Sequence, residues 1–216
     1  DPSRDVVKVD GQLIDLTTAE PVYIALHKPR GVLSSLEDEL GEGRTTVRDL
    51  IDLPGHLYPV GRLDMPSEGL MLMTNNGRLA HQLTHPRFGH EKTSRVWLVG
   101  EVNDDAIRQW RHGVLLEEKM PAPAKVKRLQ ADREITELEI KLREGRKRQI
   151  RRVANLLGYE VRRLKRIGIG SLQLGDLPKG KWRHLSPTEV QALESSTARS
   201  KSSTNRPKRP RRPHRR

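Results

Sequence analysis

The chain of 216 residues contains no cysteine and has a formal net charge of +13. It can therefore form neither a disulfide framework nor a thiolate metal site, which fits a reducing cytoplasm, and no apolar run approaches the ~20 residues that span a bilayer. The charge is concentrated in residues 141–166, with eleven Lys or Arg against two acids, and in residues 199–216, with nine and no acid. Such basic patches are the footprint of a protein that binds phosphate backbones.

Taken in chain order, apolar periodicity and turn residues divide the chain into short strands and helices. We expect a strand and turn at residues 6–11, followed by strands at 22–26, 70–73, 92–99, 124–129, 135–142, 164–168 and 171–174. We expect helices at residues 45–51, 78–83, 103–113, 147–157 and 186–193. Strands and helices in these proportions indicate an α+β fold, with mostly antiparallel strands in two lobes.

A loop rich in Gly and Pro, residues 61–69, runs directly into the apolar strand expected at 70–73. Loops that a rigid strand delivers are a usual place for catalytic groups, and Pro66 restricts the backbone that precedes it. This arrangement can hold the carboxylate of Asp64 at the edge of a cleft. A turn or helix-capping role for Asp64 is the alternative that these residues alone leave open.

The motif Gly-Arg-Leu-Asp at 61–64, with Ser-Glu-Gly-Leu at 67–70 and Thr-Asn-Asn-Gly at 74–77, resembles the signature of ribosomal-RNA pseudouridine synthases. The branch that it resembles contains the bacterial small-subunit and large-subunit enzymes. Similar motifs occur upstream at residues 28–31 and downstream at 144–152, so the resemblance covers about residues 20–190. It implies the pseudouridine synthase fold, with a mixed sheet around a catalytic cleft, and Asp64 as the nucleophile.

The resemblance also implies a domain organisation. Residues 1–20 look like the last strand and linker of an alpha-L RNA-binding domain, and a chain that begins with Asp is expected to be part of a longer protein. Residues 21–194 would form the catalytic domain. Residues 195–216, rich in Pro, Arg, Ser and Lys, cannot bury a core and are expected to be a disordered basic tail.

The helix expected at 147–157 carries the candidate partner of Asp64. Its apolar face places Arg151 at the border, whereas Arg148 and Arg152 lie nearly opposite. We therefore expect Arg151 to be a half-buried ion-pair partner that keeps Asp64 charged, in agreement with the resembled motif. The candidate RNA-binding residues are Arg62, Ser94, Arg146, Arg148, Arg152, Lys28 and Arg30. Lys28 and Arg30, on a Pro/Gly turn, could instead be merely solvated.

Ser94 departs from the resembled pattern, which usually has Tyr at this position, packed against the target base and assisting proton removal from C5. Serine has neither the ring nor the reach, and stacking of a base on an aromatic ring contributes ~1–3 kcal/mol. Trp97 is no obvious substitute, because on a strand residues 94 and 97 point to opposite faces. His81 and His85, four residues apart, could pair on a metal but lack a third ligand nearby.

The expected reaction converts a specific uridine of ribosomal RNA to pseudouridine without a metal, nucleotide or redox cofactor. It breaks an N-glycosidic bond and rejoins the sugar to C5 of the same base, by attack of Asp64 at either the base or the sugar. The partner would be ribosomal RNA or a ribosomal precursor particle. The protein itself is expected to be a cytoplasmic monomer that does not associate with a membrane. The alternatives are an RNA-binding or ribosome-assembly protein with catalysis reduced by Ser94, and a generic nucleic-acid binder.

Overall fold

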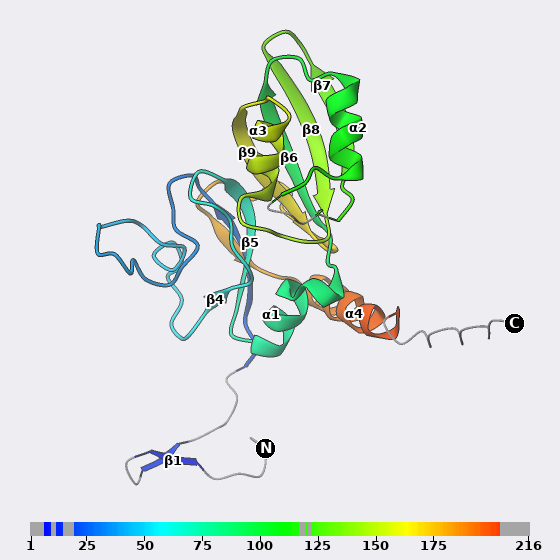
Figure 1. Ribbon diagram of the computed structural model, residues 1–216. Helices are drawn as coiled ribbons and strands as arrows, with labels where there is room; N and C mark the ends of the chain where they lie inside the picture. The colour runs from blue at the N-terminus through cyan, green and yellow to red at the C-terminus, as the bar shows by residue number, and fades with distance from the viewer. Residues whose placement is uncertain (1–6, 10–11, 15–19, 117–119, 121, 204–216) are drawn as a thin grey trace, which may run out of the picture.

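The computed structural model describes residues 7–9, 12–14, 20–116, 120 and 122–203 (Figure 1). The main sheet has nine strands, ordered β11-β3-β5-β9-β6-β8-β7, with β4 paired to β5 and β10 to β9. Its strands are β3 (Tyr23–Lys28), β4 (Tyr58–Pro59), β5 (Glu68–Thr74), β6 (Lys92–Val99), β7 (Lys125–Ala131), β8 (Ile135–Leu142), β9 (Val161–Ile169), β10 (Leu172–Gln173) and β11 (Trp182–His184). β5 and β9 are parallel, and the remaining strand pairs of this sheet are antiparallel.

Helices cover the sheet in two lobes (Figure 1). The helices are α1 (Gly77–Thr84), α2 (Asp104–His112), α3 (Gln149–Leu156) and α4 (Pro187–Ser203), and a 3₁₀ turn, η1, spans Pro86–Phe88. The upper lobe is the part of the molecule that contains β6, β8, α2 and α3. In it, Val96 of β6 and Leu138 of β8 pack with Trp110 of α2 and Val153 of α3. A separate antiparallel pair, β1 (Val7–Val9) and β2 (Gln12–Ile14), precedes the main sheet.

The lower lobe is built on both faces of β5. Leu70 and Leu72 point to one face and pack with buried leucines of α1 and α4. Met71 and Met73 point to the other face and pack with β3 and with apolar residues between positions 32 and 57. Every residue of β5 is buried, because the strand lies between these two layers. The apolar run at 70–73 therefore forms the central strand that carries the preceding loop.

The two lobes meet where β5 crosses β9 at a short parallel junction. The register there pairs Glu68 with Lys165 and Gly69 with Arg166. Gly69 has a φ of +115°, and a Cβ added to it would lie 2.2 Å from the backbone oxygen of Arg166. Only glycine fits so close a backbone approach. The junction brings the 61–67 loop of the lower lobe against the upper lobe.

The structure differs from the sequence-based expectation at several elements. Besides β2, β4 and η1, which were not expected, three differences stand out. Residues 45–51 form a bridge and a turn rather than a helix, because the Leu33 backbone bonds to the carbonyl oxygen of Thr45 and the N–H of Val47, at 2.9 Å each. The N–H and hydroxyl of Thr46 donate to the Asp49 carboxylate, and the Arg48 guanidinium donates to the carbonyl oxygens of Ile51 and Leu53. The strand β11 was not expected. Helix α4 continues to Ser203, so the expected disordered tail begins as helix, and residues 204–216 lie outside the described residues.

Within the part of the chain that the structure describes, no helix is both long and apolar enough to cross a membrane.

Candidate active site

The loop that carries Asp64 is held in place by its own backbone and by its neighbours. The carbonyl oxygen of Asp64 accepts a hydrogen bond from the N–H of Ser67 at 2.9 Å. The Ser34 hydroxyl donates to the carbonyl oxygen of Leu63 at 2.7 Å, and the N–H of Leu63 lies 3.1 Å from the same hydroxyl oxygen. The N–H of Gly31 donates to the Met65 carbonyl at 2.8 Å. The half-buried Asp64 is thus fixed just before β5.

Lys28 is fully buried, and this burial contradicts the expectation that it faces RNA. Its ammonium donates to the carbonyl oxygens of Pro29 at 2.8 Å and Ser67 at 2.9 Å, so it ties the end of β3 to the Asp64 loop. Burial and the nearby Arg166 lower the pKa of Lys28 to about 8, while Asp64 acts in the opposite direction. Arg30, two residues later on the turn, is exposed and remains a candidate RNA contact.

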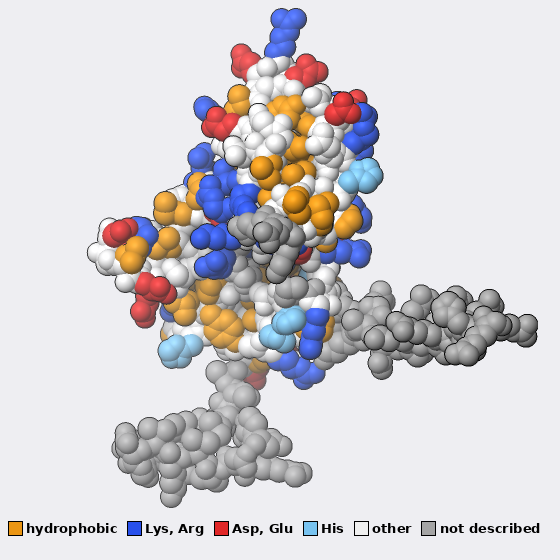
Figure 2. Space-filling view, in the orientation of Figure 1, with side chains coloured by type: hydrophobic (Ala, Val, Ile, Leu, Met, Phe, Trp, Pro, Cys, Tyr) orange, Lys and Arg blue, Asp and Glu red, His pale blue; other side chains and the backbone are white. Residues whose placement is uncertain are grey.

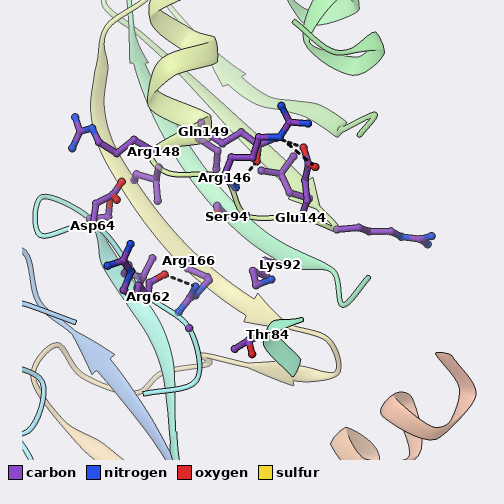
Figure 3. A pocket seen from close by; sticks show the side chains of 18 of the residues that line it. Arg62, Asp64, Thr84, Lys92, Ser94, Glu144, Arg146, Arg148, Gln149 and Arg166 are labelled. Atoms are coloured by element: carbon purple, nitrogen blue, oxygen red, sulfur yellow. Dashed lines mark hydrogen bonds and ion pairs between the residues drawn. The ribbon is translucent and has the colours of Figure 1, made fainter. Parts of the chain in front are cut away.

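A pocket of about 230 Å³ opens beside Asp64 at the junction of the lobes (Figure 3). Segments far apart in sequence line it: the 61–67 loop, the end of α1, the start of β6, and residues 142–151 between β8 and α3. Asp64, Ser94 and Arg151, which the sequence selected separately, all lie in this lining. No Phe, Tyr or Trp occurs in it among the described residues.

Arg151 of α3 bridges the two lobes at the pocket. Its guanidinium donates to the carbonyl oxygen of Pro66 at 3.1 Å and the hydroxyl of Ser67 at 3.3 Å, and to Val161 of the upper lobe at 3.3 Å. Burial lowers the pKa of Arg151, and the carboxylate of Asp64 opposes this lowering. These bonds orient Arg151 on the Asp64 loop, and the direct ion pair with Asp64 stays a prediction.

Ser94 lies on the face of β6 that turns toward the pocket. It is 5 % exposed, and the buried Val96 and Leu98 follow it on the same face. Trp97 lies on the opposite face, where the Arg163 guanidinium sits 4.7 Å from the ring centroid. Because successive side chains of β6 point to opposite faces, Trp97 faces away from the pocket, as expected from the sequence.

The loop before α3 supplies cationic side chains at the pocket. Glu144 and Gln149 organise this loop: Gln149 Nε2 donates to the Glu144 carboxylate at 2.7 Å, and Gln149 Oε1 accepts from the N–H of Arg146. Arg146 also donates to the carbonyl oxygen of Met120. Arg148, in a left-handed conformation with φ of +51°, is exposed, as is Arg62. Figure 2 shows Lys and Arg side chains gathered at the waist between the lobes.

The Arg152 side chain is half-buried on α3 and does not line the pocket. His81 and His85 have ring centroids 5.1 Å apart, and both rings lie edge-on to Phe88. Across the described residues, no set of three His, Cys, Asp or Glu side chains is placed to hold a metal ion.

Comparison with known proteins identifies this arrangement. The family model described as RNA pseudouridylate synthase matches residues 22–156. The chain belongs to the RNA pseudouridylate synthase family. Such synthases are isomerases, as expected from the sequence.

Two relatives and one solved structure place the chain within this synthase family. It is 38% identical over 194 residues to the ribosomal large subunit pseudouridine synthase B of Bacillus subtilis, covering 88% of this chain and 78% of the relative. It is 37% identical to the dual-specificity RNA pseudouridine synthase RluF of Escherichia coli O157:H7, covering 91% and 67%. A pseudouridylate synthase crystal structure superposes with a TM-score of 0.75 at 31% identity, covering 84% and 76%. This superposition confirms the expected fold class.

The pocket of this synthase contains groups that were not predicted, among them His90, Lys92 and Arg166. Arg166 of β9 is 4 % exposed; its Nε donates to the carbonyl oxygen of Leu70 at 2.7 Å and its Nη1 to that of Arg62 at 3.3 Å. Burial lowers the pKa of Arg166 to about 10. The sequence did hold a signal for this residue, because Arg166 shares the strand parity of the apolar Leu164.

Proposed function

We propose that the protein isomerises a specific uridine of ribosomal RNA to pseudouridine, with Asp64 as the nucleophile. The observation that carries this proposal is a half-buried carboxylate fixed at the edge of a pocket that both lobes line. One relative is a ribosomal large subunit pseudouridine synthase, which supports ribosomal RNA as the substrate. The cysteine-free composition fits action in the cytoplasm, on ribosomal RNA or a precursor particle, by a monomer.

The target uridine must leave its stack to reach the pocket, which costs a few kcal/mol. Phosphate contacts from exposed arginines can offset this cost, because each contact releases condensed counterions. Arg30, Arg62 and Arg148 are exposed on this side of the junction and are our candidates. Arg146 and Arg152 act in this proposal by supporting the loop and helix, in addition to any RNA contact.

In the reaction the bond between C1′ and N1 breaks, a bond between C1′ and C5 forms, C5 loses a proton and N1 gains one. Asp64 attacks either the base or the sugar, and both routes use the same carboxylate. Arg151 holds the loop at Pro66 and Ser67 and contributes positive charge near Asp64, which favours its ionised form. A reorientation of Arg151 on binding RNA would complete the expected ion pair.

The deciding experiment compares the unaltered protein with Asp64→Asn, in an isomerisation assay on ribosomal RNA and on precursor particles. We expect pseudouridine from the unaltered protein and a rate lower by ~10⁴ or more for the variant, since covalent catalysis is lost. RNA affinity and thermal unfolding should be nearly unchanged. Turnover retained by Asp64→Asn would remove this residue from the mechanism.

A second candidate function is an RNA-binding or ribosome-assembly role with reduced catalysis. The pocket lining favours it, because the described residues include no Phe, Tyr or Trp there to stack on the base. The same assay separates the two functions: tight RNA binding without pseudouridine formation by the unaltered protein would select the second.

A further inference from the structure

The floor of the pocket carries cationic side chains that the Asp64 loop and α3 do not supply. Lys92 starts β6, two residues before Ser94, and therefore lies on the same face of the strand. Arg166 of β9 is the register partner of Ser94. Lys92 and Arg166 are near one another, since the charge of Arg166 contributes to lowering the pKa of Lys92. Figure 3 shows both side chains in the pocket below Ser94.

These groups have donors that the protein leaves without acceptors. Arg166 Nη2 is buried without a hydrogen-bond partner among the described residues. Lys92 is only half-buried, and within the described part of the chain it makes neither a hydrogen bond nor an ion pair. His90 Nε2, also in the lining, is buried and unpartnered. Buried donors such as Arg166 Nη2 are nearly always satisfied in native proteins, because leaving such a bond unmade is costly. Two neighbouring cations add repulsion, so the missing occupant is rich in oxygen acceptors or negatively charged.

The other carboxylates of the pocket do not fill this role. Glu144 is engaged by Gln149 and lies near Arg146 at 3.6 Å. Asp64 stands on the lower-lobe loop, and no hydrogen bond or ion pair joins it to Lys92 among the described residues. An RNA phosphate would meet the exposed arginines first, whereas Arg166 is nearly inaccessible from outside. A flipped base is the part of the substrate that can reach this depth.

Resting on the proposed function, we propose that Lys92 is a catalytic residue that, with Arg166, binds the carbonyl oxygens of the target uracil and stabilises the negative charge of the base. When the C1′–N1 bond breaks, its electron pair leaves with the uracil and spreads over N1 and the carbonyl oxygens. When C5 bonds to C1′, this charge is consumed, and the C5 proton leaves afterwards. Addition of Asp64 to the base would place a similar charge on the same oxygens.

Electrostatic retention of this kind suits a pocket whose described lining has no Phe, Tyr or Trp. Ser94, which stands where the resembled pattern usually has tyrosine, brings no ring into this pocket. The base would be held at its edge by charge-assisted hydrogen bonds, which are roughly twice as strong as neutral ones. Preorganised donors aimed at developing charge need no reorganisation during the reaction.

The test uses two variants with opposite expected effects. Lys92→Met removes the charge and keeps the chain length, whereas Lys92→Arg keeps the charge. We expect the single-turnover rate on ribosomal RNA to fall ~10²–10³-fold in Lys92→Met, as for loss of one oxyanion donor, and to recover substantially in Lys92→Arg. RNA affinity should stay within about twofold. Lys127→Met, on the exposed side of β7, is the control for loss of one positive charge and should keep the full rate.

The pH dependence of the single-turnover rate distinguishes a catalytic role of Lys92 from a structural one, because a purely structural residue would not change it. Burial and Arg166 lower the pKa of Lys92, so the unaltered enzyme should lose rate as alkaline pH removes the ammonium proton. Lys92→Arg should keep its rate to higher pH. The other charged and titratable groups around Lys92 are common to both proteins. They are Asp64, Glu144, His85, His90, Arg62, Arg143, Arg146, Arg148, Arg151 and Arg166 in the pocket lining, and Lys28, which binds the Asp64 loop.

The outcomes are distinct. A normal single-turnover rate in Lys92→Met, beside an active unaltered protein, overturns the role of Lys92 and leaves the proposed function intact. A loss of RNA affinity with an unchanged single-turnover rate at saturating RNA means that Lys92 binds a phosphate, and also overturns the inference. Should Lys92→Met fail to fold, identical alkaline limbs for the unaltered protein and Lys92→Arg overturn it. No pseudouridine from the unaltered protein overturns both proposals.

Discussion

Replacing Gly69 by alanine tests the junction of the lobes most directly. At its φ of +115°, any non-glycine residue is strained by ~1–3 kcal/mol. The new Cβ would also lie 2.2 Å from the Arg166 oxygen and 2.6 Å from its nitrogen, so β5 and β9 must separate by about 1 Å. This separation weakens their backbone pairing and the bond from Arg166 Nε to Leu70, each contributing ~0.5–1.5 kcal/mol. We expect a total loss of about 3–5 kcal/mol.

Gly55→Ala is the matched control, because Gly55 has a φ of +94° and an added Cβ meets no atom within 4 Å. It should lose only the backbone strain of ~1–3 kcal/mol. The free energy of unfolding of each variant is measured by urea titration, followed by circular dichroism. Single-turnover rates should fall further in Gly69→Ala, because Arg166 moves with β9. Equal losses of stability in the two variants would refute the argument from close backbone approach.

The other predictions concern Ser94 and the docking of α4. Ser94→Tyr should raise the single-turnover rate roughly ten- to a hundredfold if stacking is the missing contribution. Ser94→Phe separates the effect of the ring from that of the hydroxyl. No gain in rate with intact RNA binding would mean that serine at this position is no defect. Glu189→Gln should destabilise the protein by ~1 kcal/mol at neutral pH, because Arg183 binds the Glu189 carboxylate at 2.7 Å through two nitrogens. These bonds hold the pKa of Glu189 at about 2, so its contribution is present above pH 4.5 and disappears as the pH falls toward 2. Urea titrations measure the free energy of unfolding of both proteins across this pH range. A difference between them that stayed constant with pH would contradict the stabilising role of the Glu189 carboxylate.

Local patterns predicted much of this molecule. The alternation of 92–99 placed Ser94 and Trp97 on opposite faces, and Asn103 and Gly113 marked the ends of α2. These features depend on strand period and capping, which act within a few residues. They needed no knowledge of the partner strands.

Features that arise from long-range contacts were not predictable. Lys28 is buried because β3 pairs with β5 and so meets the backbone of Ser67, thirty-nine residues away. Strand parity with Leu164 marks Arg166 as buried, but its position at the pocket depends on the parallel crossing of β5 and β9, which no local pattern specifies. The expected helix at 45–51 failed because the Leu33 backbone bonds to the carbonyl oxygen of Thr45, which a helix would use, and to the N–H of Val47.

The exposed or buried positions of the methionines make their oxidation a measure of local unfolding. Its four methionines are Met65, Met71, Met73 and Met120, and there is no cysteine to compete for an oxidant. Met65 and Met120 are exposed, and Met71 and Met73 are completely buried in β5. Peroxide converts accessible thioethers to sulfoxides. Met65, beside Asp64, would therefore be oxidised in the folded protein. Met71 and Met73 would be oxidised only when the lower lobe unfolds locally, so their sulfoxides would report how often that unfolding occurs.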